Sequence, residues 1–322
     1  MTCSETLRDS LSFASTARPQ PLYSLGPSIL SFAAYRGNDN IHSSVKQTVF
    51  TTHLKEYTKR SLTYDEDAIS ALRGITGNLA IDDYWSIPIF AKSGNERKLS
   101  FLAGLLWSPK DMSSAVPVRR RLQFPSWTWA NLTVQVGYDL ILKDSDLRHI
   151  LEDPIIDYGN LYELSTEVEI RLPSGIHLPV QDFSLSKAIS EVEVPSSLFI
   201  EAKVLEIGQI WRDSRNKLRL FVHFQNSYDE SARGLGEIVL DEYVGEGVDI
   251  PGHVRGNLET QRWWAVDLFS RCYTSLSRDE NKWIYFLMVE QCGGVAKRIG
   301  VGSVNGMSYH QIPKTRTRFE LR

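Results

Sequence analysis

The apolar residues between positions 44 and 59 recur every three to four positions, and polar residues fill the gaps between them. This spacing is that of an amphipathic helix that buries one stripe of side chains. The stripe consists of Val45, Val49, Phe50, Leu54 and Tyr57. The pattern therefore predicts a helix from about Ser44 to Lys59.

A second helix is predicted from about Tyr64 to Ala80. The residues at its start, Thr63-Tyr64-Asp65-Glu66, have the Thr-x-x-Glu form of a capping box. In a capping box the threonine hydroxyl and the glutamate carboxylate both accept hydrogen bonds from free backbone amides. The apolar face that follows consists of Ala68, Ile69, Leu72, Ile75 and Leu79.

The next apolar run, residues 99 to 107, ends shortly before Pro109. Periodicity cannot distinguish a buried helix from a strand in so short a run, and we favour a helix. The polar and charged residues from Asp111 to Arg121 predict an exposed connection.

Beyond Phe124 the pattern changes to the two-residue alternation of strands. Apolar and polar residues alternate over 167–172, 198–204 and 217–224, whereas 283–289 is apolar throughout, as in a strand covered on both faces. The expected fold class is α+β, with a small helical lobe followed by a mainly antiparallel β sandwich or barrel-like half. We expect a loosely structured lead-in (1–40), a helical lobe (41–118) and a β-rich lobe (119–322).

The composition is that of a folded chain without a dominant charge. Of its 322 residues, 42% are hydrophobic and 11% aromatic, which is enough for a sizeable core. The formal net charge of -3 gives no positive field for nucleic acid or for an anionic membrane. Three cysteines without metal-binding spacing and the absence of a secretory signal pattern favour a cytoplasmic location.

Residue types that carry catalysis are present but scattered. No histidine pair has the spacing of a helical zinc site. Gly234-Leu235-Gly236 and Gly245-Glu246-Gly247 lack the full fingerprint of a phosphate loop. The acidic cluster at 65–67 suits the positive end of a helix dipole. The sequence therefore predicts no catalytic residue, no cofactor and no metal.

The stretch RRRLQFPSWTWANL (119–132) combines three arginines with two tryptophans. If it were a strand, Trp127 and Trp129 would share one face. Because tryptophan is highly buried on average, we interpret the pair as an anchor between the helical lobe and the sheet. The alternative is a recognition surface, since Trp and Arg are common interface anchors.

Five segments together resemble the region downstream of the HET domain in fungal heterokaryon-incompatibility proteins. Their order and spacing agree with the family pattern from about residue 56 to residue 302. The segments are EYTKRSLTYDEDAISALRGITGNL (56–79), YWSIPIF (84–90), LAGLLWSP (102–109), RRRLQFPSWTWANL (119–132) and KRIGVG (297–302).

This resemblance implies a role in non-self recognition. The HET domain itself has no counterpart in the sequence, which begins near what resembles its trailing edge, so none of its active-site positions carries over. We expect a non-catalytic accessory region that contacts a HET-type effector domain or other incompatibility proteins. Its expected structural signature is Tyr57, Arg60, Asp67, Trp107, Arg120, Trp127, Trp129, Arg298 and Gly300.

Within this signature, a buried Arg120 or Arg60 is expected to pair with an acidic residue such as Asp67, because a buried guanidinium requires a partner. Three alternatives remain open from the sequence. One is an enzyme that uses Asp82 or Asp83 with a histidine at the junction of the two lobes. Another is a remnant without function. The third is a carbohydrate-binding sheet, for which Trp263-Trp264 is the only hint.

Overall fold

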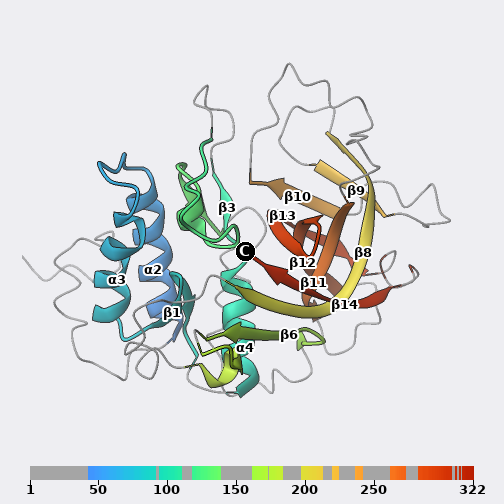
Figure 1. Ribbon diagram of the computed structural model, residues 1–322, viewed down its shortest axis with the longest axis horizontal. Coiled ribbons are helices and arrows are strands. Elements are labelled where there is room, and N and C mark those ends of the chain that lie inside the picture. The colour runs from blue at the N-terminus through green and yellow to red at the C-terminus, as the bar shows by residue number, and fades with distance from the viewer. Residues whose placement is uncertain are drawn as a thin grey trace, which may run out of the picture.

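The computed structural model combines a helical lobe with a large, mainly antiparallel sheet (Figure 1). It describes residues 43–91, 94–110, 118–138, 162–172, 174–183, 197–212, 220–224, 236–241, 262–272, 282–306, 309, 312 and 314–322. Helices α2 (Ser43–Thr58) and α3 (Asp67–Asn78) lie on one side of the molecule, the sheet lies on the other, and α4 (Gly94–Gly104) stands between them. The α+β class expected from the sequence is confirmed.

Helix α2 matches its predicted range closely, and Val49, Phe50 and Leu54 are buried as the apolar stripe requires. Helix α3 begins later than predicted, and the capping box is wrong. Glu66 has helical dihedral angles and makes no side-chain capping bond. Residues 63–66 form a turn, whereas a capping residue needs an extended backbone.

A short hairpin follows α3. Strands β1 (Asp82–Tyr84) and β2 (Ile87–Ile89) pair in antiparallel fashion around Trp85 and Ser86, whose φ angles are 52° and 61°. Two successive left-handed residues make the tight turn whose twist matches that of a hairpin.

The helix predicted for 99–107 is confirmed as far as Gly104, where α4 ends. Leu105 to Trp107 leave the helix and lead into β3 (Ser108–Pro109), which pairs with β4 (Val136–Gly137). Trp127 and Trp129 do not lie on a strand. Residues 125–128 form a turn, and a 3-10 helix, η1, spans Trp129–Asn131 because the Thr128 side chain caps it by accepting from the amide of Ala130.

The large sheet has ten strands in the described part of the chain. They are β5 (Tyr162–Glu163), β6 (Glu167–Arg171), β7 (His177–Pro179), β8 (Leu198–Arg212), β9 (Leu220–Phe224), β10 (Gly236–Leu240), β11 (Arg262–Cys272), β12 (Lys282–Cys292), β13 (Val295–Asn305) and β14 (Thr315–Leu321). A 3-10 helix, η3 (Val180–Asp182), follows β7. The strand predictions for 167–172, 198–204 and 283–289 are confirmed by β6, β8 and β12. Strand β9 confirms 220–224 only, because 217–219 lie outside the described residues.

Six of these strands pair in a cycle. Neighbouring pairs run β8–β9–β10–β13–β12–β11, and β11 pairs with β8 again. Strand β14 is antiparallel to β8 and parallel to β13, so the sheet is mixed. A compact cluster of apolar side chains comes from β8, β10, β11, β12 and β13 together with Tyr309 and Ile312.

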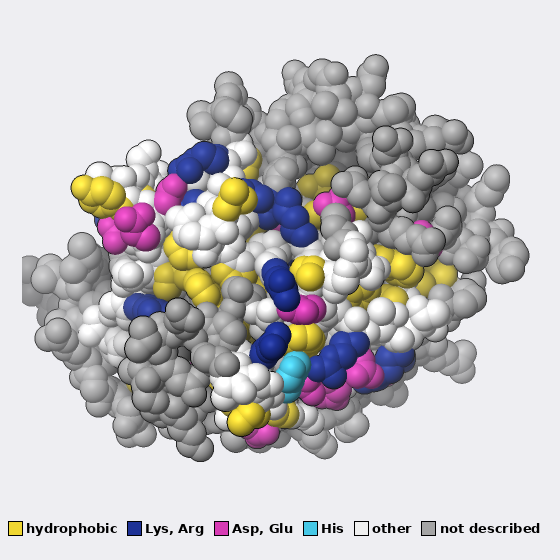
Figure 2. Space-filling model, in the orientation of Figure 1, with side chains coloured by type: hydrophobic (Ala, Val, Ile, Leu, Met, Phe, Trp, Pro, Cys, Tyr) yellow, Lys and Arg dark blue, Asp and Glu magenta, His cyan; other side chains and the backbone are white. Residues whose placement is uncertain are grey.

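A larger cluster of buried side chains draws on α2, α3, α4, both tryptophans of the 119–132 stretch and several sheet strands. Packing is therefore continuous from the helical lobe into the sheet. On the face shown in Figure 2, acidic side chains are interspersed with the Lys and Arg side chains of the described residues. None of the described helices is both long and apolar enough to span a bilayer.

The predicted lead-in and the predicted exposed connection lie wholly or partly outside the residues that the structure describes. The lead-in (1–40) and residues 111–117 lie outside the described residues. The exposed connection is wrong at its end, where the Arg121 side chain is buried because it donates to the carbonyls of Ala130 and Leu132.

Candidate functional site

The side chain of Arg298 on β13 is completely buried where the helical lobe meets the sheet. Its Nε and Nη2 each donate to the carboxylate of Asp241 over 3.1 Å, and its Nη1 donates to the Leu105 carbonyl over 2.7 Å. Its Nη2 also donates to the Trp107 carbonyl. Burial lowers the pKa of Arg298 to about 10, against the opposing effect of Asp241, so the guanidinium stays charged at neutral pH.

The two tryptophans of the 119–132 stretch are core residues, with exposures of 0% for Trp127 and 1% for Trp129. Trp127 stacks on Tyr84 at a centroid distance of 5.3 Å. Trp129 donates through Nε1 to the Ser86 carbonyl over 3.1 Å, and Thr128 donates to the Trp85 carbonyl over 2.7 Å. The segment thus holds the β1–β2 turn in place, as the anchoring interpretation expects.

This segment also contacts the sheet and the run after α4. The indole of Trp107 donates to the Trp127 carbonyl over 3.0 Å. The backbone amide of Arg298 donates to the Ser126 hydroxyl over 3.1 Å. The amide of Ser126 donates to the carbonyl of Arg322 over 3.0 Å. Three segments that are distant in sequence therefore meet at one junction.

Arg120 forms the expected ion pair with an acidic residue, but that residue is Asp241 and not Asp67. Arg60 and Asp67 are both exposed, so neither needs a buried partner. Arg120 also donates to the Asn131 side chain over 2.7 Å and lies 4.0 Å from Asp241. Asp241, a residue that sequence reasoning missed, is therefore the acidic group of this junction.

Tyr57 and Gly300 have clear packing roles. The Tyr57 ring packs edge-on against Trp129 at 6.1 Å, and its hydroxyl donates to the Asp67 carbonyl over 3.3 Å. A Cβ atom at Gly300 would lie 2.5 Å from the Val239 carbonyl oxygen. Only glycine permits β13 and β10 to approach this closely.

Asp65 connects the turn before α3 to the arginine stretch. It accepts from Arg119 over 2.7 Å and from Arg121 over 2.9 Å. Hydrogen bonds from Arg121 and Arg119 lower the pKa of Asp65. The sequence placed Asp65 only at a helix start, because neither its local pattern nor its spacing indicates an arginine partner.

The carboxylates of the enzyme alternative serve the fold. Asp83 is buried and accepts from the Thr76 hydroxyl over 3.1 Å and from the Ser86 amide over 3.0 Å. Burial raises its pKa. Asp82 forms an ion pair with Arg97 at 2.8 Å. Within the described residues, no group of three or more His, Cys, Asp or Glu side chains could hold a metal ion.

Trp263 and Trp264 do not form a row of exposed aromatics. They point to opposite faces of β11, as adjacent strand residues must. Trp263 packs against the compact cluster and donates to Glu290 over 3.1 Å, whereas Trp264 packs against the larger core beside Phe319. The carbohydrate-binding alternative has no support in this pair.

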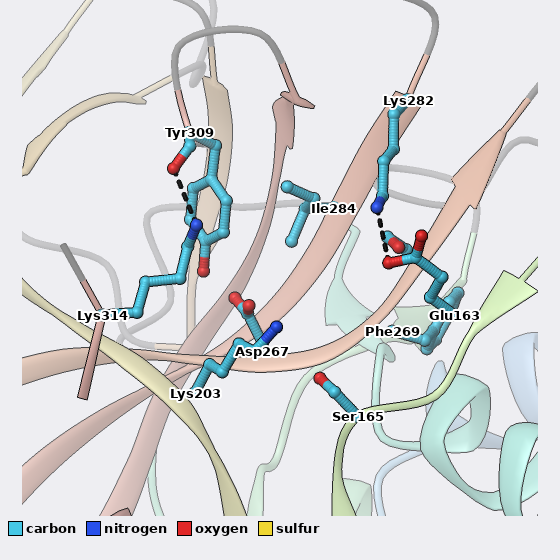
Figure 3. Close-up of a pocket in the computed structure, with 10 residues that line it drawn as sticks. Glu163, Ser165, Lys203, Asp267, Phe269, Lys282, Ile284, Tyr309 and Lys314 are labelled. Carbon is cyan, nitrogen blue, oxygen red and sulfur yellow. Dashed lines mark hydrogen bonds and ion pairs between the residues drawn. The ribbon is translucent and has the colours of Figure 1, made fainter. Parts of the chain in front are cut away.

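A cavity opens at one end of the strand cycle, and Asp267 on β11 lies in its middle (Figure 3). Its lining side chains come from β5 and the residues after it, β8, β11, β12 and the segment between β13 and β14. They are Glu163, Ser165, Lys203, Asp267, Phe269, Ser270, Lys282, Ile284, Tyr309 and Lys314. Its empty volume is about 350 Å³ including the open mouth.

Asp267 is the most unusual group of this cavity. Its side chain is buried, and within the described part of the chain its Oδ1 has no hydrogen-bond partner. Burial raises the pKa of Asp267 to about 7, and Lys314, Lys203 and Lys282 oppose that rise. A buried carboxyl group near three ammonium groups can accept or donate a proton near neutral pH.

The cavity's lysines differ in their surroundings. Lys282 forms an ion pair with Glu163 at 2.6 Å (Figure 3). Lys314 donates to the Tyr309 carbonyl over 2.9 Å and lies 4.2 Å from the centre of the Tyr309 ring. Burial lowers the pKa of Lys314. Lys203 is exposed at the cavity, with its ammonium group toward Asp267 (Figure 3).

Sequence reasoning did not find this cavity. The only available signal was Asp267 itself, a carboxylate inside the apolar run WWAVDLF. Comparisons of the chain with protein-family models, with curated proteins and with solved structures found no match.

Proposed function

We propose that this chain is the region that follows a HET domain in the fungal heterokaryon-incompatibility family. In this proposal it acts in the cytoplasm as a non-catalytic accessory region and takes part in non-self recognition through contacts with an effector domain or other incompatibility proteins. The observation that carries the proposal is that three of the five segments on which the resemblance rests meet at one place in the fold.

The meeting point is the guanidinium of Arg298. It reaches Leu105 across 193 positions of sequence and Trp107 across 191. The FPSWTW segment joins through Ser126 and through the carbonyl of Trp127. A set of motifs that builds one buried junction is what a structural signature requires.

We further infer that the β-rich half is barrel-like. The cyclic pairing of β8, β9, β10, β13, β12 and β11 supports this inference. A cluster of apolar side chains drawn from five of the strands is what the interior of a small barrel contains.

The arginine stretch offers a surface for protein contacts. Leu122 is 89% exposed and Tyr64 is 60% exposed. The two loops that carry them are joined by the ion pairs of Asp65 with Arg119 and Arg121. Exposed apolar side chains rimmed by charged groups are typical of a docking surface for another protein.

The test is co-purification of the full chain with HET domains encoded in the same genome. We expect a complex with the native chain that Leu122→Asp weakens. The matched control is Ile176→Asp, because Ile176 is 61% exposed and lies on the turn between β6 and β7. Failure of every HET domain to bind, or equal binding by both variants, would contradict the proposal.

A further inference from the structure

The cavity around Asp267 has the composition of a small-molecule site. We propose that it binds a small organic anion that carries a hydroxyl group, with the anionic end at Lys203 and Lys314 and the hydroxyl donating to Asp267. This inference rests on the cavity alone and does not depend on the family resemblance.

The charge of the lining favours an anion. Three ammonium groups face two carboxylates, and one of these, Glu163, already pairs with Lys282 at 2.6 Å. The Lys314 ammonium has three donors, of which one is directed at the Tyr309 carbonyl. Lys203 and Lys314 are therefore placed to donate to a phosphate or carboxylate group, and such charge-assisted hydrogen bonds are strong.

A ligand with only an anionic group would leave the Asp267 carboxyl group without a hydrogen-bond donor. Its buried Oδ1 lacks a hydrogen-bond partner among the described residues. A buried acceptor without a donor is costly, and a ligand hydroxyl would supply the donor. Because Asp267 lies between the two lysines and the apolar wall of Phe269 and Ile284, the hydroxyl must be close to the anionic group (Figure 3).

Strand β11 is irregular directly after this carboxyl group. The register between β11 and β12 shifts between Asp267 and Phe269, which marks a β-bulge. Leu268 and Phe269 consequently both pack into the larger core, and the Phe269 ring also lines the cavity beside Asp267. Bulges commonly re-aim a side chain beside a binding site, and ligands commonly occupy the mouth of a ring of strands.

The same lining argues against a cation as the ligand. Calcium and magnesium sites gather several oxygen ligands of negative or neutral charge. Here three ammonium groups lie around Asp267, and Glu163 is engaged by Lys282. A divalent cation would meet electrostatic repulsion at this position.

The experiment measures binding of glycerate and of glycerol 3-phosphate to the full chain by calorimetry, with glycerol and inorganic phosphate as component controls. The two hydroxylated anions distinguish a carboxylate ligand from a phosphate ligand. We expect at least one of the two hydroxylated anions to bind saturably and more tightly than glycerol or inorganic phosphate does.

Three variants locate the site. Lys203→Met should weaken binding about tenfold, since one charge-assisted hydrogen bond is lost. Asp267→Ala should reduce the preference for the hydroxylated anion over inorganic phosphate. Lys59→Met, which changes an exposed lysine directly after the distant helix α2, should leave binding unchanged. Lys203 is exposed, so its variant should fold, and a melting curve checks this.

Two results would overturn the assignment. One is that neither hydroxylated anion binds saturably at millimolar concentration. The other is that Lys203→Met and Lys59→Met bind with the same affinity as the native chain, which would place the anion elsewhere on the surface.

Discussion

The guanidinium carbon of Arg298 lies 3.3 Å from the centre of the Trp107 ring, and both side chains are completely buried. A desolvated cation–π contact of this kind contributes about 2 kcal/mol. Asp241 supplies the compensating charge, and the carbonyls of Leu105 and Trp107 accept the remaining donors. The stacked pair therefore connects β13 with the segment that leaves α4.

Removing the Arg298 side chain should destabilise the protein strongly. Arg298→Ala takes two hydrogen bonds from the buried Asp241 carboxylate. We expect the free energy of unfolding to fall by about 3–5 kcal/mol. The control is Lys59→Ala, which removes a solvent-exposed ion pair with Glu56 and should change the free energy of unfolding far less. Urea denaturation of both variants checks the difference, and similar midpoints would contradict it.

Gly300 should not tolerate alanine. Its added Cβ would lie 2.5 Å from the Val239 carbonyl oxygen, so β10 and β13 would have to separate. We expect Gly300→Ala to cost about 1–3 kcal/mol. Gly294→Ala is the matched control on the same hairpin, because no atom lies within 4 Å of its added Cβ. Thermal unfolding of the two variants provides the comparison.

Thr128 has two hydrogen bonds that valine cannot make. Its hydroxyl accepts from the Ala130 amide at the start of η1 and donates to the Trp85 carbonyl. Thr128→Val keeps the shape and should cost about 1–2 kcal/mol, because it leaves buried polar groups without partners. Thr133→Val, at a half-buried threonine whose hydrogen bond to Arg119 is exposed to solvent, should cost less. Equal losses of unfolding free energy would show that the Thr128 hydroxyl is dispensable.

Asp267 should make stability depend on pH. Its folded pKa of about 7 lies above the ordinary value of 3.8, so the folded protein binds this proton more tightly than the unfolded chain does. The contribution of the Asp267 proton to the free energy of unfolding is fully present below about pH 4 and is lost as the pH rises to about 7. Three pKa units correspond to about 4 kcal/mol.

The variant Asp267→Asn should remove this dependence. Native and variant proteins are compared by urea denaturation at pH 5 and at pH 8. We expect the native chain to lose stability relative to the variant between the two pH values. A parallel pH dependence in both proteins would mean that Asp267 is not the titrating group.

Local pattern predicted α2 well, because its buried residues Val49, Phe50 and Leu54 recur at helical spacing. Helix α4 is buried at every position from Arg97 to Gly104, so periodicity could not identify it. The start of α3 was wrong because Glu66 adopts helical dihedral angles, which no local motif reveals. Pairings between residues that are distant in sequence could not be predicted from local patterns. Asp65 meets Arg119 across 54 positions, and Asp241 meets Arg298 across 57.

The burial of both tryptophans was predictable from their size and apolar character, and the structure confirms it. Their local conformation was not, because η1 is held by the Thr128 cap and by contacts with residues distant in sequence. The Asp267 cavity was also beyond sequence reasoning. Its lining comes from five separate parts of the chain, and only the pairing of the strands brings them together.

The central claim is that Arg298 and Trp107 act as one unit that joins the lobes. A double-mutant cycle with Arg298→Met, Trp107→Leu and the double variant measures this directly by urea denaturation. The account predicts a coupling free energy of about 1–3 kcal/mol between the two side chains. The claim would be contradicted if the losses of unfolding free energy in the two single variants summed to the loss in the double variant within about 0.5 kcal/mol.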